Sequence, residues 1–120
     1  MSLDLNFDGS KYTASTEGRA GSSYGGNSYS YSISLLENHE YQFGISWDPP
    51  NYHSTQYYYR LYSGSTLVAY GTPDANHYYP TGGFTYKSTS DQNYSLRLIG
   101  YGDYTITVNS IDIPNFDDGD

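Results

Sequence analysis

Oxygen-bearing side chains alternate near the start of the chain with the spacing of a calcium loop. Asp4, Asn6 and Asp8 stand two residues apart, and Gly9 follows directly. Oxygen ligands at alternating positions can wrap a hard cation, and a glycine permits the sharp turn that such loops make. The bidentate glutamate of a complete loop is absent, because Ser15 occupies its position. The first residues therefore predict a partial calcium site.

A second acidic segment, near the other end of the chain, repeats the Asn-Phe-Asp motif over residues 115–117. Domain termini often lie close together, so the two segments together can complete one site. We assign Asp112, Asp117 and Asp118 as the additional ligands, and we expect calcium to stabilise the folded domain. Two alternatives are open. Each end is half of a calcium-rigidified linker between tandem modules, or both ends are solvated acidic linkers.

Tyrosine and arginine alternate in the middle of the chain, where they predict a binding surface. Leu61 fixes the buried face of a strand over residues 56–62, so the even-numbered residues of that strand should face solvent. Aromatic rings stack on sugars or on proline-rich polymers, and tyrosine with arginine is common at the centres of interfaces. The alternative is that these rings only cover the sheet of a domain poor in aliphatic residues. The candidate contacts, two of them in a long loop, are Tyr58, Arg60, Tyr62, Tyr78 and Tyr79.

Catalytic motifs are incomplete. The segment that starts at His39 reads H-E-Y-Q-F, so Phe43 stands where a zinc-protease motif needs its second histidine. Glu37 and Glu40 flank a predicted turn, whereas paired glycosidase carboxylates need a cleft around them. Cysteine is absent, which excludes thiolate zinc sites and cysteine catalysis. We therefore expect no enzymatic activity.

Alternation of polar and apolar residues with a period of two predicts strands along most of the chain, and no segment has helical periodicity. The clearest strand runs from Tyr41 to Trp47, and the prolines that follow it end it. Seven to eight short strands at roughly ten-residue spacing predict an all-β fold, an antiparallel β-sandwich. We expect strands at residues 11–14, 28–35, 41–47, 56–62, 66–70, 84–87, 93–99 and 104–108.

Tyrosine must supply much of the core. Leucine, isoleucine, valine and phenylalanine together number only 20 of 120 residues, but there are 17 tyrosines, many in alternation with small polar residues. A tyrosine ring buries a large apolar area while its hydroxyl reaches for a partner. The predicted core consists of Tyr29, Tyr31, Ile33, Tyr41, Phe43, Ile45, Trp47, Leu61, Leu96, Leu98, Tyr104, Ile106 and Val108.

Charge and composition limit the partners of the domain. The formal net charge is −8, and six of the 13 acids lie in the first eight or last nine residues. The nearly neutral body offers little to nucleic acid, and no apolar run approaches membrane-spanning length. We expect one domain, with a lead-in at 1–27 that contains one short strand, a sandwich body at 28–110 and an acidic linker at 111–120. A cysteine-free chain rich in Tyr, Ser, Gly and Asn is typical of exported bacterial proteins, which predicts a secreted or cell-surface location.

Three segments resemble the bacterial pre-peptidase C-terminal (PPC-like) domains. They are Ser32–Phe43, with its "strand, small turn, Tyr-x-Phe" element; Tyr59–Ala69, which is similar to the "L-Y-x-x-x-G-x-x-L-A" hairpin; and Asn93–Val108, which is similar to the closing "Y-x-L-x-V-x-G-Y-G-x-Y-x-L-x-V" hairpin. The family's opening "D-x-D-x-Y-x-F" strand corresponds to Asn27–Ile33, where the acids are absent. The collagen-binding domains of clostridial collagenases are similar in layout.

This resemblance implies a jelly-roll-like sandwich that accompanies a protease, another hydrolase or an adhesin. We therefore expect a non-catalytic accessory domain of a secreted or surface bacterial protein, with the neighbouring domains of that protein as partners. The alternative is an adhesin module that binds carbohydrate or protein, such as a polysaccharide or an extracellular matrix protein.

Overall fold

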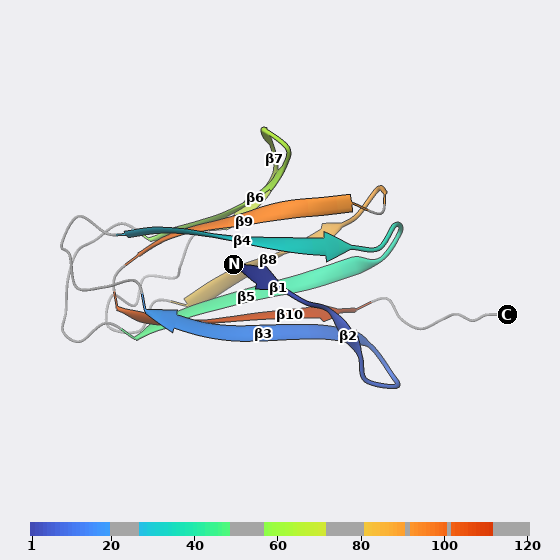
Figure 1. Cartoon of the computed structure of the whole chain (residues 1–120), viewed down its shortest axis with the longest axis horizontal. Helices are drawn as coiled ribbons and strands as arrows, with labels where there is room; N and C mark the ends of the chain where they lie inside the picture. Colours follow the sequence, from blue (N-terminus) through green and yellow to red (C-terminus); the bar gives the residue numbers. More distant parts are fainter. Residues whose placement is uncertain (20–26, 49–56, 72–80, 91, 101, 112–120) are drawn as a thin grey trace, which may run out of the picture.

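The computed structural model describes residues 1–19, 27–48, 57–71, 81–90, 92–100 and 102–111. These residues form two five-stranded sheets packed face to face, which confirms the predicted all-β sandwich (Figure 1). No helix occurs in these ranges, and hence none that is long and apolar enough to cross a membrane. Sheet A has the order β1 (Ser2–Leu3), β4 (Asn27–Leu35), β9 (Gln92–Gly100), β6 (Tyr58–Ser63), β7 (Thr66–Gly71). Sheet B has the order β2 (Asn6–Phe7), β3 (Tyr12–Arg19), β10 (Asp103–Ser110), β5 (Glu40–Asp48), β8 (Thr81–Lys87).

Consecutive strands usually belong to different sheets. Only β2–β3 and β6–β7, among these ten strands, are successive and paired in one sheet. The segment over residues 93–108 was expected to be a closing hairpin, but it is not one. Its first strand, β9, pairs with β4 and β6, whereas β10 pairs with β3 and β5. Because β9 and β10 lie in opposite sheets, their alternating apolar residues enter the core from its two sides.

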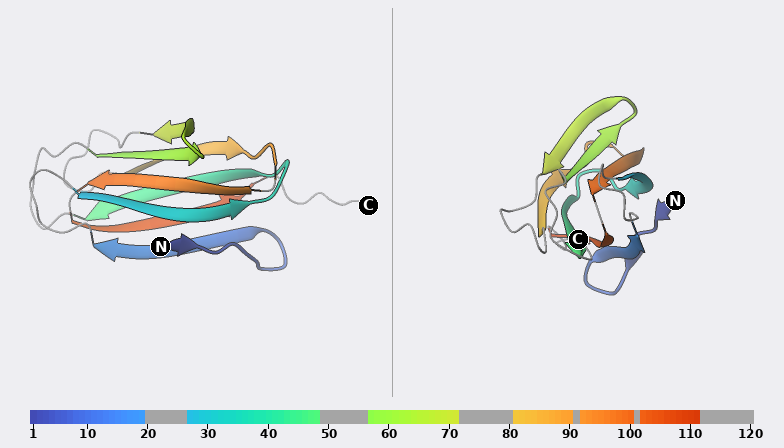
Figure 2. Two further views of the ribbon diagram at one scale, coloured as in Figure 1. Left: turned by 45° about the horizontal axis from the view of Figure 1, so that its top comes forward. Right: turned by 90° about the vertical axis from the view of Figure 1, so that its left-hand side faces the viewer.

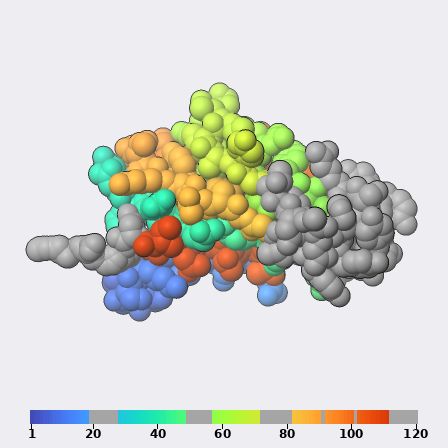
Figure 3. Space-filling view, turned by 180° about the vertical axis from the view of Figure 1, so that it is seen from behind, coloured from blue at the N-terminus to red at the C-terminus, as the bar shows by residue number. Residues whose placement is uncertain are grey.

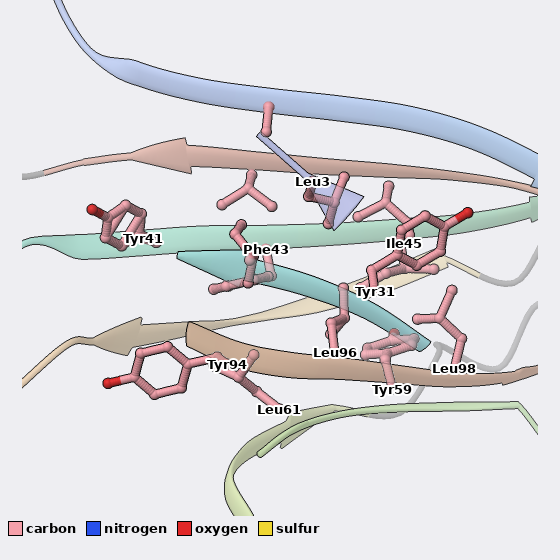
Figure 4. Close-up of a cluster of buried hydrophobic side chains, with 14 of the residues drawn as sticks. Leu3, Tyr31, Tyr41, Phe43, Ile45, Tyr59, Leu61, Tyr94, Leu96 and Leu98 are labelled. Carbon is pink, nitrogen blue, oxygen red and sulfur yellow. The ribbon is translucent and has the colours of Figure 1, made fainter. Parts of the chain in front are cut away.

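The core contains all but one of the predicted residues. Tyr29 is the exception: it is partly buried and packs at the edge, with its ring centroid 6.0 Å from that of Tyr104. Figure 4 shows how the rings and aliphatic side chains of the two sheets meet. The buried apolar residues are Leu3, Ala14, Tyr31, Ile33, Leu35, Tyr41, Phe43, Ile45, Trp47, Tyr57, Tyr59, Leu61, Tyr94, Leu96, Leu98, Tyr104, Ile106 and Val108.

The first 19 residues belong to the sandwich instead of leading into it. They supply β1, β2 and β3, and they bury Leu3 and Ala14 in the core. The strand expected at 11–14 extends to Arg19 through its pairing with β10. Its inward positions are taken by small residues, which give no apolar pattern from which that length could be predicted. Gly18 is one of these positions, where a Cβ atom would overlap the ring of Tyr104. The described residues contain ten strands, and the two that correspond to none of the eight expected ranges are the two-residue strands β1 and β2.

Candidate binding face

The outer face of sheet A presents the predicted tyrosine–arginine surface. Tyr59 and Leu61 of β6 are fully buried, so the even-numbered residues of this strand point away from the core, as expected. Strand β9 lies between β6 and β4, and all three are visible side by side in Figure 2. We call this surface the binding face. Its members are Tyr58, Arg60 and Tyr62 of β6; Ser95, Arg97 and Ile99 of β9; Ser28, Ser30, Ser32 and Ser34 of β4; and Tyr70 of β7.

Each arginine of the binding face is stacked on a tyrosine. The guanidinium carbon of Arg60 lies 4.1 Å from the ring centroid of Tyr58, two residues back on the same strand. The guanidinium carbon of Arg97 lies 4.3 Å from the ring centroid of Tyr62, on the neighbouring strand. Both distances are typical of cation–π contacts. The rings of Tyr58 and Tyr62 are partly buried, whereas both arginines are exposed.

The two arginines face each other across the β6–β9 pairing, where Arg60 is the register partner of Arg97. Like charges directly opposite on neighbouring strands destabilise a sheet. Stacking on different tyrosines draws the two guanidinium groups toward opposite ends of β6. None of the five strands of sheet A contains an aspartate or a glutamate. The binding face is therefore locally cationic on a chain whose net charge is −8.

Hydroxyl groups flank the arginines. Strand β4 alternates serines with its buried residues, and Ser30 pairs with Arg97 while Ser32 pairs with Ser95. The hydroxyl of Ser34 donates to Oδ1 of Asn93. Strand β1 extends the sheet beside this row, because the amide of Ser32 donates to the carbonyl of Met1 over 2.9 Å.

The β6–β7 hairpin extends the binding face at its other side. Tyr70 pairs with Arg60 and is 66% exposed, so its ring is open to a ligand. A register shift follows Leu61, and β7 bends away from the body of the sandwich, as Figures 1 and 3 show. A cavity of about 350 Å³ lies between β7 and β8, lined by Leu67, Val68, Ala69, Tyr70, Phe84 and Thr85.

Arg97 and Tyr70 are the charged and aromatic members of the binding face that were not among the candidate contacts. The outward direction of Arg97 follows from the alternation around it, but its contact with Tyr62 depends on the β6–β9 pairing, which no local pattern shows. Tyr70 was predicted only as part of a strand. Of the candidate contacts, Tyr58, Arg60 and Tyr62 lie together, and Tyr78 and Tyr79 lie outside the described residues.

The acidic N-terminal segment forms a β-hairpin. Its residues Asp4, Asn6 and Asp8 are all exposed, and Asn6 belongs to β2, which pairs with Tyr12–Thr13 of β3. The side-chain nitrogen of Asn6 donates to the carbonyl of Asp4 over 3.3 Å. This extended backbone differs from the curled loop that wraps an ion.

The side chain of Asp8 closes the turn of this hairpin. Its Oδ1 accepts hydrogen bonds from the amides of Ser10 and Lys11, both at 2.9 Å, and from the Ser10 hydroxyl at 3.0 Å. The backbone hydrogen bonds of Lys11 and then Ser10 lower the pKa of Asp8. Gly9 adopts φ of 100°, which a glycine tolerates best. One carboxylate oxygen of Asp8 is thus committed to the turn, and the other is open to a cation.

The remaining predicted ligands, Asp112, Asp117 and Asp118, lie outside the described residues. Within the described residues, no three His, Cys, Asp or Glu side chains gather as a metal site would require. Calcium binding between the two ends of the chain therefore stays a prediction.

Buried tyrosine hydroxyls pair with each other. The hydroxyls of Tyr31 and Tyr104 lie 2.7 Å apart in the core, and those of Tyr86 and Tyr94 lie 3.4 Å apart near one end of the sandwich. Burial, together with the bond to Tyr31, raises the pKa of Tyr104. Burial and the bond to Tyr94 raise the pKa of Tyr86 to about 12. Tyr86 and Tyr104 therefore stay protonated at neutral pH and act as structural hydrogen-bonding groups.

Comparison with known proteins shows the fold. No family model matches the chain, and no curated protein matches it in sequence. Among solved structures, the pre-peptidase C-terminal domain of collagenase from Bacillus anthracis is similar over 89% of this chain and 91% of that one, with a TM-score of 0.54 and 15% sequence identity. The predicted likeness to these domains is confirmed at the level of the fold.

A second kind of protein has a similar fold. Two solved structures of PliG, a periplasmic inhibitor of g-type lysozyme, are similar to this chain, and they come from two bacteria. The Aeromonas hydrophila protein is similar over 92% of this chain and 96% of its own, with a TM-score of 0.57 and 8% identity. The Salmonella Typhimurium protein gives a TM-score of 0.52 and 11% identity over 92% and 97%.

Proposed function

We propose that this chain is a non-catalytic accessory domain of a protein exported from a bacterial cell, and that it attaches that protein to a partner through the binding face. The observation that carries the proposal is the pair of exposed arginines, Arg60 and Arg97, each stacked on a tyrosine in a sheet without acidic residues. Arginine and tyrosine dominate the energetic centres of interfaces. The two guanidinium groups are positioned by their tyrosines, and the strands of their sheet offer them no carboxylate, so they are suited to bind an acceptor group of a partner.

The fold supports a binding role over a catalytic one. One similar structure is a domain of a collagenase, and two others are inhibitors of an enzyme. The PliG proteins are periplasmic, which agrees with the export expected from the cysteine-free composition. Calcium at the acidic N-terminal hairpin belongs to this proposal as a stabilising ion.

A binding screen tests the function. The immobilised chain is presented with soluble polysaccharides and extracellular matrix proteins, alongside the double variant Arg60→Gln, Arg97→Gln. We expect one class of partner to bind the parent chain and to bind the variant at least tenfold more weakly. The proposal is contradicted if the immobilised chain retains none of the polysaccharides or proteins in the screen. It is also contradicted if the chain itself degrades a polymer that it retains.

A further inference from the structure

We propose that the ligand of the binding face is a linear polysaccharide that carries carboxylate groups, with Arg60 and Arg97 each binding one carboxylate of the polymer. This inference rests on the proposed function and names its substrate class. It is argued from the spacing of the two cations, from how the tyrosines hold them, and from the neutral groups beside them.

The two guanidinium groups stand at separate positions along β6. Tyr58 and Tyr62 are four residues apart on one strand, which corresponds to about 13 Å at the usual rise per residue. Each ring holds one guanidinium group, so the two cations are directed to different tyrosines and each can bind an anionic group of its own. Two carboxylates borne at intervals on one extended polymer can reach both.

Stacking prepares the arginines for carboxylates. A guanidinium group on a tyrosine uses its flat face for the ring and keeps the N–H donors of its edge for an acceptor. That edge matches a carboxylate in a bidentate pair. Because the ring already restricts the side chain, less conformational entropy is lost on binding than for a free arginine.

Charge complementarity selects an anionic ligand at this face. The chain carries a net charge of −8, so a polyanion meets repulsion from most of the molecule. Sheet A holds Arg60 and Arg97 and no acid within its strands. We therefore expect a polymer with spaced carboxylates to bind this face more strongly than any other surface of the described sheets.

The neutral groups of the face favour a polysaccharide over an acidic peptide. Ser30 lies beside Arg97, Ser95 beside Tyr62, and the exposed ring of Tyr70 beside Arg60. Serine hydroxyls both donate to and accept from sugar hydroxyls, and an exposed ring is a stacking surface for a pyranose. A peptide would instead seek an unpaired strand edge, whereas β9 and β6 are paired on both sides.

Polygalacturonate and its fully methyl-esterified form test the proposal, because esterification replaces each carboxylate by a neutral methyl ester and leaves the polymer backbone unchanged. We expect polygalacturonate to bind the chain, by calorimetry, and the ester to bind at least tenfold more weakly. Arg60→Gln and Arg97→Gln should each weaken binding about tenfold, and added salt should weaken it further. The control variant Lys11→Gln, Lys87→Gln removes two positive charges outside sheet A and should bind as the parent does.

Other probes separate the failures. Equal binding of poly-glutamate would make the face a peptide site, and equal binding of dextran sulfate would remove the preference for carboxylates; either result overturns the inference. If a neutral polysaccharide or a matrix protein binds and the arginine variants bind it equally well, the inference falls while an accessory binding role stands. Unchanged melting curves for the variants ensure that lost binding reflects lost contacts.

Discussion

The hydroxyls of Tyr31 and Tyr104 lie 2.7 Å apart and join the two sheets across the core. Tyr31 comes from β4 of sheet A and Tyr104 from β10 of sheet B. Their rings meet edge to face, with centroids 6.3 Å apart. Both side chains are buried, so each hydroxyl depends on the other for a partner in place of water.

Removing both hydroxyls of this pair should cost less than the sum of the costs of removing each one alone. Tyr31→Phe leaves the buried hydroxyl of Tyr104 without its partner, which we expect to lower the free energy of unfolding by about 1–3 kcal/mol. The double variant Tyr31→Phe, Tyr104→Phe should lose less than the two single variants together, since no buried donor remains unpaired. Urea denaturation of the four proteins measures the cycle, and strictly additive losses would contradict the pairing.

High pH should destabilise the domain through buried Tyr104. The pKa of Tyr104 is raised above the ordinary value of 10.0, whereas in the Tyr86–Tyr94 pair the pKa of Tyr86 is raised to about 12 and that of Tyr94 is lowered, so the effects of this pair oppose each other. The neutral form of Tyr104 is therefore favoured in the folded state, and this stabilisation is complete below about pH 10, the pKa of tyrosine in an unfolded chain. It is lost as the pH rises from 10 toward the raised pKa of Tyr104, because this side chain then ionises only in the unfolded chain.

Denaturant titrations from pH 8 to 12 measure this effect. We expect a plateau at the lower end and a steep decline in the free energy of unfolding above about pH 10. The free energy of unfolding of the Tyr104→Phe variant should decline less steeply in that range. The two slopes should differ by at most about 1.4 kcal/mol per pH unit. A decline of the same slope in parent and variant would show that Tyr104 does not contribute.

Gly100 should not tolerate a side chain. A Cβ atom at this position of β9 would overlap the six-membered ring of Trp47, which comes from the opposite sheet and is fully buried. Gly100→Ala should therefore lower the free energy of unfolding by about 1–3 kcal/mol, the usual cost of overpacking, and shift the tryptophan fluorescence. Ser30→Ala, at an exposed position of β4, is the control and should change neither quantity.

Calcium should raise the melting temperature through the acidic ends of the chain. We expect a rise of several degrees in millimolar calcium and a smaller one in magnesium, which demands tighter octahedral geometry. The double variant Asp4→Asn, Asp8→Asn should abolish the rise. Asparagine can still accept the turn hydrogen bonds of Asp8, so the hairpin survives in the variant and the loss reports on the ion. Identical melting curves with calcium and with a chelator would show that the two ends are solvated acidic linkers that bind no calcium.

The strands and their buried faces could be predicted from sequence because alternation is a local signal. Leu61 alone fixed which residues of β6 point outward, and the structure agrees for Tyr58 and Arg60. The partners of each strand could not be predicted, because pairing is a non-local choice. The sequence over 93–108 is equally compatible with a hairpin and with a crossing between sheets. The contact of Arg97 with Tyr62 depends on the pairing of β9 with β6, so it could not be predicted from the sequence.

The bulge in the β6–β7 hairpin opposes edge-to-edge association between copies of this molecule. Strand β7 is an edge strand without a charged residue, and it exposes Leu67 and Tyr70. Such an edge is a template on which a second chain can add a strand and start an aggregate. The register shift after Leu61 leaves Val68 as an extra residue and bends the edge, which interrupts the row of amides and carbonyls that a neighbour would need. We therefore expect a chain without Val68 to have a straighter β7 edge and to aggregate more readily than the parent chain.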